Sequence, residues 1–129
     1  MEISQKSTKG FTVDLRAGGK MAVLRFLDRN LNFHVSETLR DELKRTIEER
    51  AAAGSSAVVL DLGEVGVVDS CGVGVVIAAC NHSSSLGVSL GLCRVSPFID
   101  RVLEVMRLKR HLRIFETEEQ AVAALLPPS

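Results

Sequence analysis

The residues best placed to do chemistry lie in an Asp-Ser-Cys-Gly run that separates two apolar stretches between Val58 and Cys80. Ser70 stands at the predicted start of an apolar helix, so we expect its hydroxyl to cap the first turn by accepting from backbone N–H groups. A phosphate on that oxygen would add about −1.5 to −2 charges, and a helix N-terminus tolerates an anion well. The pattern therefore leaves two readings open: a serine that only caps a helix, or a serine that is phosphorylated.

Two glycines follow Ser70 at positions where a helix would prefer other residues. Gly72 and Gly74 cost helix propensity, which indicates that something other than helix stability favours them. We interpret them as bare backbone that another molecule can approach. The run thus predicts a surface for a partner, centred on a single hydroxyl.

Catalytic motifs do not fit this segment. A nucleophile elbow requires glycine where Val68 stands, and the chain has neither a Walker lysine motif nor a complete dinucleotide fingerprint. Asp69 is the one candidate base beside Ser70, and we expect it to fix the loop or contact a partner. The sequence therefore predicts a binding protein and not an enzyme.

The elements that must position Ser70 alternate along the chain. Residues 11–15 and 21–27 predict an antiparallel hairpin. Ser36 is expected to cap a first helix, whose apolar stripe is Leu39, Leu43 and Ile47. Residues 58–60 form a buried strand, and an apolar helix begins near Cys71.

The second half of the chain repeats this alternation. Strands are predicted at 88–92 and 112–115. Ser96 and Pro97 start a helix with Phe98, Val102, Val105 and Met106 on one face, and Thr117 with Gln120 forms a capping box for the last helix. Alternating strands and helices favour right-handed crossovers and a mainly parallel sheet, whose ligands meet the carboxyl ends of the strands.

Composition limits the remaining functions. Sixteen basic and sixteen acidic residues cancel in a chain of 129 residues, so neither nucleic acid nor an anionic membrane is an expected partner. No apolar run approaches the roughly 20 residues of a membrane span, and the start lacks a signal-peptide core, so we expect a cytoplasmic protein. Residues 1–10 are expected to be flexible, residues 11–126 to form one domain, and residues 127–129 to be a tail.

Cysteines and histidines give no metal-binding pattern. The cysteines are Cys71, Cys80 and Cys93, and the histidines are His34, His82 and His111. Their spacing matches no ligand set and no disulfide framework, so we expect neither a metal nor another cofactor. A thiol in the first turn of a helix can have a lowered pKa, which keeps redox sensing at Cys71 as a minor alternative.

The string LDLGEVGVVDSCGVGVVIAA, with GVSLGL and VSPFIDRVLEVMRL after it, resembles the STAS domain of bacterial anti-sigma factor antagonists over about residues 11–126. The resemblance implies an α/β, SpoIIAA-like STAS fold: a mixed, mainly parallel sheet of about five strands, four main helices and an N-terminal hairpin. In that family the first serine of the motif is phosphorylated, which corresponds to Ser70. The partner-binding residues implied are Asn32, Asp69, Ser70, Cys71, Gly72 and Gly74.

The resemblance also implies a mechanism. Unphosphorylated at Ser70, the chain would sequester an anti-sigma factor that is itself a GHKL-type serine kinase, which frees the sigma factor for transcription. Phosphorylation would release the kinase, and a PP2C-type phosphatase would reset the switch. The antagonist would act as a monomer or weak homodimer.

Two positions depart from the family pattern. Asn32 stands where the family usually has aspartate, and Cys71 replaces the usual second serine or threonine. Asn32 keeps the size of the side chain and can accept a hydrogen bond, but it has no charge. The alternative function is therefore a STAS scaffold that is not phosphorylated and assembles within a signalling or membrane-associated complex.

Overall fold

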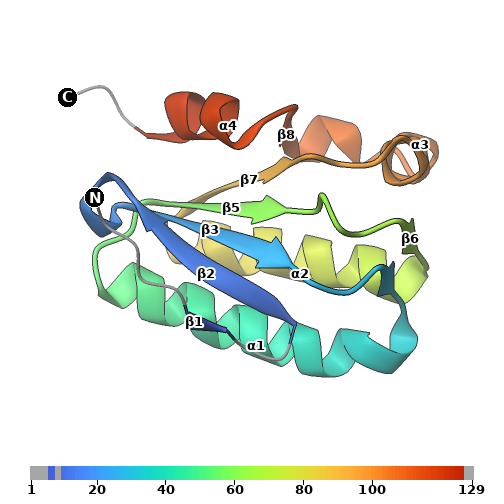
Figure 1. Ribbon diagram of the computed structural model, residues 1–129, viewed down its shortest axis with the longest axis horizontal. Helices are drawn as coiled ribbons and strands as arrows, with labels where there is room; N and C mark the ends of the chain where they lie inside the picture. Colours follow the sequence, from blue (N-terminus) through green and yellow to red (C-terminus); the bar gives the residue numbers. More distant parts are fainter. Residues whose placement is uncertain (1–5, 8–9, 127–129) are drawn as a thin grey trace.

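The structure is a computed structural model that describes residues 6–7 and 10–126. Its centre is a mixed sheet with the strand order β1-β2-β3-β5-β7-β8 (Figure 1). The strands are β1 (Lys6–Ser7), β2 (Phe11–Arg16), β3 (Met21–Phe26), β5 (Ala57–Asp61), β7 (Ser89–Cys93) and β8 (Arg113–Phe115). β1, β2 and β3 pair antiparallel, whereas β3, β5, β7 and β8 pair parallel. The predicted N-terminal hairpin and mainly parallel sheet are confirmed.

Four α-helices accompany the sheet in the described part of the chain, as the sequence predicts. They are α1 (Phe33–Ala52), α2 (Ser70–Ser85), α3 (Pro97–Val105) and α4 (Glu118–Leu125). Short 3-10 turns occupy Ala17–Gly19 and Lys109–His111. α1 and α2 cover one face of the sheet, α4 lies over the other, and α3 lies near the end of the sheet toward which β5 and β7 run (Figure 1). None of the described helices is both long and apolar enough to cross a membrane.

Successive side chains of β3 and β5 point to opposite faces of the sheet, and this alternation divides the core into two layers. Leu24 and Leu60 point into the cluster beneath α1 and α2, while Val23 and Val59 point into the cluster beneath α4. All four are fully buried. Burying a side chain of this size stabilises a fold by about 1.5–3 kcal/mol, so the sheet is fixed from both faces. Asp61 continues the alternation and therefore faces the α4 layer.

The segment before α1 contains more structure than the sequence predicts. Asn30–Leu31 forms β4, which pairs in parallel with β6 (Val67–Val68) in a separate two-stranded ladder. α1 begins at Phe33, because the Asn32 side chain caps it by accepting from the His34 N–H at 3.0 Å. The prediction that Ser36 caps this helix is wrong: Ser36 is buried inside it and donates to the Phe33 carbonyl.

The expected apolar face of α3 is turned outward. Ile99 and Leu103 are the residues that α3 buries, whereas Phe98 and Val105 are 50% and 73% exposed. Both sets recur at helical spacing, so periodicity alone cannot decide which of them faces the core. The Ser96 cap and the Thr117 cap are present as predicted, with acceptance from the Ile99 and Gln120 N–H groups.

Of the ten residues expected to form a flexible N-terminus, Lys6–Ser7 pair with β2, and Gly10 is buried. Residues 1–5 and 8–9, and the tail at 127–129, lie outside the described residues.

A close backbone contact attaches α2 to the small ladder. A Cβ placed on Gly72 would lie within van der Waals overlap of the Leu31 carbonyl oxygen and 2.5 Å from a methyl carbon of Val68. Gly74, one half-turn further, has only the flexible end of Arg40 nearby, at 3.4 Å. Glycine is thus required at 72 for packing, whereas at 74 it is not.

We predict that Gly72→Ala destabilises the chain by about 3 kcal/mol, because the new methyl group must displace backbone in β4. Gly74→Ala is the matched control on the same helix, and it should be neutral or stabilising by up to about 1 kcal/mol through helix propensity. Urea unfolding curves of both variants measure the difference. Equal stabilities for the two variants would contradict the packing role of Gly72.

Candidate functional site

α2 begins at the end of the molecule toward which β5 and β7 run (Figure 1). Ser70 is the first residue of α2, and its side chain is exposed. Within the described chain, no group forms a hydrogen bond with the Ser70 hydroxyl, so the oxygen is available to a molecule from solvent. The predicted location of the site is therefore one that a kinase could reach.

Asp69 is the residue that caps α2, and the prediction that Ser70 is the cap is wrong. Its backbone is extended, and Oδ1 accepts from the Gly72 N–H at 2.9 Å. Oδ2 accepts from the Phe33 N–H at 3.1 Å, at the start of α1. A carboxylate has two acceptor oxygens, so Asp69 can serve both helix N-termini at once, which a serine hydroxyl beside it cannot match. This arrangement leaves the Ser70 oxygen unused.

The six predicted partner-binding residues do not form one exposed surface. Asp69, Ser70 and Cys71 are exposed, and Asn32 and Gly74 are half-buried. Gly72 is buried against Leu31, so its interpretation as backbone open to a partner is wrong. Asn32 lies close to Asp69. Asn32 caps α1, and the Asp69 side chain accepts a hydrogen bond from Phe33, the residue that follows Asn32.

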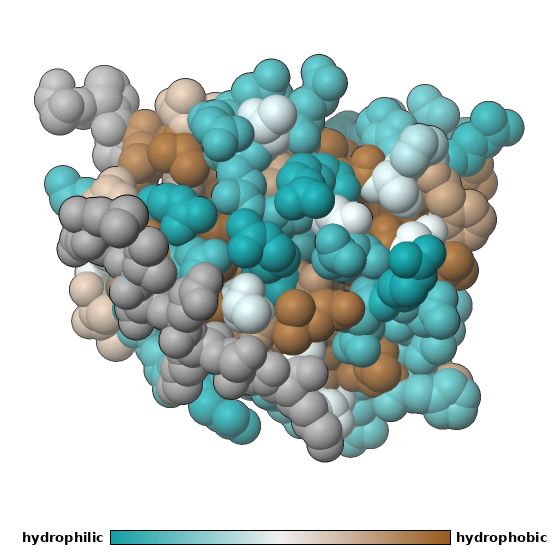
Figure 2. Space-filling model, viewed as in Figure 1, coloured by the Kyte–Doolittle hydropathy of each residue, from teal (hydrophilic) through white to brown (hydrophobic). Residues whose placement is uncertain are grey.

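Large apolar side chains surround this end of the molecule, and the sequence did not identify them as a surface. Phe33 is 62% exposed at the start of α1, and Val67 is 52% exposed on β6. Phe98 and Val105 are exposed on α3, which contacts β6. Figure 2 shows apolar side chains among polar ones where α3 and β6 lie. Exposed apolar groups gathered near one site are typical of a protein interface.

A second group of reactive side chains lies on the opposite face of the sheet, between the strands and α4. Arg25 is its centre: its guanidinium contacts Glu118 at 2.7 Å, Asp14 at 3.2 Å and Asp61 at 3.4 Å. Arg94 also contacts Asp61, at 3.4 Å. We call these five residues the charge cluster. They connect β2, β3, β5 and α4 with the residue that follows β7.

In the charge cluster, the pKa of Asp61 is lowered and that of Glu118 is raised. Burial of Asp61 opposes its ionisation, but hydrogen bonds from Glu118 and the Gly63 N–H, with the two arginines, hold its pKa below the usual value. The hydrogen bond to Asp61 and then burial raise the pKa of Glu118, against the effect of Arg25. A proton shared between the two carboxyls therefore stays mainly on Glu118.

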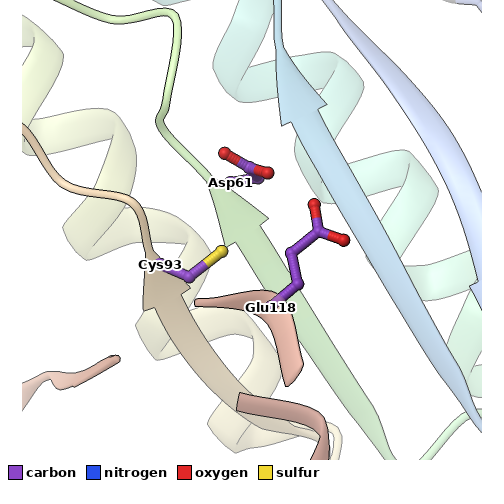
Figure 3. Close-up of side chains that lie close together, drawn as sticks. All are labelled: Asp61, Cys93 and Glu118. Atoms are coloured by element: carbon purple, nitrogen blue, oxygen red, sulfur yellow. The ribbon is translucent and has the colours of Figure 1, made fainter. Parts of the chain in front are cut away.

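Asp61, Glu118 and Cys93 converge closely enough to suggest metal ligands, with ligand atoms within 4.8 Å of one another (Figure 3). The chemistry does not suit a metal. Burial, followed by the charges of Asp61 and Glu118, raises the pKa of the Cys93 thiol to about 12, so it is not a thiolate at neutral pH. Arg25 and Arg94 already neutralise the carboxylates. The group is an ion-pair network that attaches α4 to the sheet.

The fold defines a class of protein, and comparison of the sequence gives the family. A mixed sheet with α1 and α2 on one face, and an Asp-Ser-Cys-Gly run starting α2, is the arrangement of a STAS domain. The family model of the STAS domain matches residues 14–121, and the chain belongs to this family.

Three relatives show what the chain is similar to. An anti-sigma F factor antagonist from Paenibacillus polymyxa is 26% identical over 99 residues, covering 77% of this chain and 82% of that protein. The structure of an anti-sigma-factor antagonist (STAS) domain protein from Planctomyces limnophilus is 18% identical with a TM-score of 0.76, covering 89% and 97% of the two chains. The Bacillus cell fate determinant SpoIIAA in its phosphorylated form is 20% identical with a TM-score of 0.65, covering 90% and 99%.

We predict a graded loss of stability when the capping groups are removed. Asn32→Ala deletes one capping bond and should cost about 1 kcal/mol, whereas Asp69→Ala deletes two and should cost about 2 kcal/mol. Asp69→Asn, which keeps one acceptor oxygen, should fall between the parent and Asp69→Ala. Urea unfolding measures all three variants, and an Asp69→Ala loss no larger than that of Asn32→Ala would contradict the shared cap.

We predict that Arg25→Gln destabilises the chain by about 2 kcal/mol near neutral pH, because it leaves the buried Asp61 carboxylate with Arg94 alone. In the parent, the lowered pKa of Asp61 contributes stability above its unfolded value of about 3.9, and this contribution is lost as pH falls further. In the variant the carboxyls gain protons more readily, so its deficit should shrink as pH falls toward about 4.5.

Arg16→Gln is the matched control, because Arg16 contacts Glu118 at 3.4 Å from a more exposed position at the rim. Its loss should be below about 1 kcal/mol. Urea unfolding at both pH values measures each variant, and a pH-independent Arg25→Gln deficit would rule out the proposed role.

Proposed function

We propose that this chain is an anti-sigma factor antagonist controlled by phosphorylation of Ser70. The observation that carries the proposal is the exposed Ser70 hydroxyl, which has no hydrogen-bond partner in the described chain because Asp69 caps α2 in its place. The relative from Paenibacillus polymyxa is named an anti-sigma F factor antagonist, and the structure of the Bacillus relative SpoIIAA is of its phosphorylated form. The chain would act by binding and not by catalysis.

In the unphosphorylated state, the surface around Ser70 would dock on an anti-sigma factor that is a GHKL-type serine kinase. The exposed Phe33, Val67 and Phe98 supply apolar area for such an interface near the hydroxyl. Docking would sequester the anti-sigma factor and leave the sigma factor free for transcription. A monomer or weak homodimer in the cytoplasm suffices for this role, without nucleic acid or membrane contact.

Phosphorylation would reverse docking through charge. A phosphate of about −1.5 to −2 charges would stand beside the exposed Asp69 carboxylate and the apolar interface. An uncompensated charge buried in an interface costs roughly 3–5 kcal/mol. At about 1.4 kcal/mol per tenfold change, affinity would fall by roughly two to four powers of ten. A PP2C-type phosphatase would restore the binding state.

The two departures from the family pattern are compatible with this switch. Asn32 still caps α1 with its amide oxygen, so the neutral residue preserves the local backbone while it removes a negative charge from the site. Cys71 is exposed in the first turn of α2, beside Ser70, and it replaces a neutral hydroxyl with a neutral thiol of similar size.

Incubation with ATP and the kinase that co-purifies with the unmodified chain tests the proposal by intact-mass measurement. The parent and a Cys71→Ser control should each gain one phosphate, and Ser70→Ala should gain none. Ser70→Asp should bind the kinase at least tenfold more weakly than the parent.

Absence of phosphate on the parent would favour the alternative function, a STAS scaffold in a signalling or membrane-associated complex. A Ser70→Asp variant that binds as tightly as the parent would also contradict the switch.

A further inference from the structure

A groove runs between α1 and α2 on the outer side of the helical layer, and one arginine extends from it toward the start of α2. The groove has a volume of about 410 Å³. Its floor includes Leu43, Val75 and Ala79, and Arg40 and Lys44 line its α1 side. The Arg40 guanidinium lies over Gly74, where its Nη2 atom would be 3.4 Å from a Cβ. The missing side chain of Gly74 makes room for the guanidinium.

Gly74 and Ser70 are neighbours on the surface of α2. Residues four positions apart in a helix share a face, with about 5–6 Å between their Cβ atoms. The Cα–Cβ direction in a helix also tilts toward the N-terminus, so the space above Gly74 opens toward Ser70. The Arg40 guanidinium, which lies against Gly74, is therefore on the same side of α2 as Ser70.

The Arg40 side chain is positively charged and available to bind an anion. It is exposed, and no described acidic residue forms an ion pair with it. Lys44, one turn further along α1, adds a second positive charge on the same side of the groove. Helical side chains point toward the N-terminus of their own helix, and α1 begins beside Ser70 through the Asp69 contact. The direction that Arg40 favours is thus the direction of Ser70.

We propose that Arg40 is the residue that receives the phosphate group of phosphorylated Ser70. This inference rests on the proposed function, because it assigns a role in the regulation of the same site. A guanidinium presents paired N–H donors that match phosphate oxygens, and Gly74, one turn from Ser70, has no side chain that would block the guanidinium. The phosphate would then lie along α2 over Gly74, held within the antagonist itself.

Phosphorylation would therefore place the negative phosphate on Ser70 against the positive guanidinium of Arg40. The Arg40 pair stabilises the phosphorylated state within the antagonist, but one guanidinium charge does not cancel the roughly −1.5 to −2 charges of the phosphate, so negative charge remains at the docking surface. Other charged groups at the starts of the two helices are His34, Glu37, Asp41 and Asp69. These groups are the same in parent and variant, so a comparison isolates the effect of Arg40.

The test uses the full chain with phosphoserine incorporated at position 70 during synthesis, so no kinase is needed. Titration followed by phosphorus NMR gives the second pKa of the phosphate in the parent and in Arg40→Gln. A nearby cation favours the dianion, so we expect this pKa to be about half a unit higher in Arg40→Gln than in the parent. Arg40→Lys, which retains the charge, should keep part of the effect.

Arg45→Gln is the matched control, because it removes the same charge from the exposed surface of α1 at a residue that does not line the groove. It should titrate like the parent. Equal pKa values in Arg40→Gln and Arg45→Gln would overturn the inference.

The two proposals can fail separately. If the kinase phosphorylates Ser70 but the Arg40→Gln titration is unchanged, only the role of Arg40 is refuted. If the titration shifts but no kinase modifies the chain, only the proposed function is refuted.

Discussion

The two hydrogen bonds of the Asp69 carboxylate are the interaction on which the candidate site depends. One oxygen caps α2 and the other reaches the first N–H of α1, so a single side chain aligns the starts of two parallel helices. Because this carboxylate accepts from an N–H group at the start of each helix, the Ser70 hydroxyl is not needed as a cap, and it has no hydrogen-bond partner among the described residues. A residue that is free of structural duties can carry a modification without unfolding the element that presents it.

On the face of the sheet that α4 covers, ion pairs connect the elements, whereas helix caps connect them at the Ser70 end. Alternation along β2, β3 and β5 directs Asp14, Arg25 and Asp61 to the α4 side, where a short helix leaves part of the sheet for polar groups. Glu118, in the first turn of α4, completes the ion pairs. Because a displaced α4 would leave the buried Asp61 carboxylate with fewer partners, these ion pairs restrict where α4 docks, together with its apolar contacts.

The sequence predicts most of the fold because its signals are local. Alternation in the hairpin, the continuous apolar strand before Asp61, and the Ser96 and Thr117 caps each depend on neighbouring residues, and each is present. The sequence assigns the cap of α2 to Ser70, whereas in the structure Asp69 is the cap and the Ser70 hydroxyl has no hydrogen-bond partner among the described residues.

The features that the sequence did not predict depend on contacts between distant residues. The β4 and β6 ladder contains two residues per strand, which is too short for a periodic signal, and the Gly72 contact requires knowledge of where Leu31 lies. The outward face of α3 has the same spacing as its buried face. Nothing in a local pattern relates Arg40 to a glycine on another helix.

The β4 and β6 ladder also bears on the thermodynamics of recognition. It holds the chain on both sides of the site, since Leu31 precedes Asn32 and Val68 precedes Asp69. A loop that is already ordered has little conformational entropy left to lose when an enzyme or a partner binds it. Association at this end of the molecule should therefore be limited by surface complementarity and not by disorder of the acceptor.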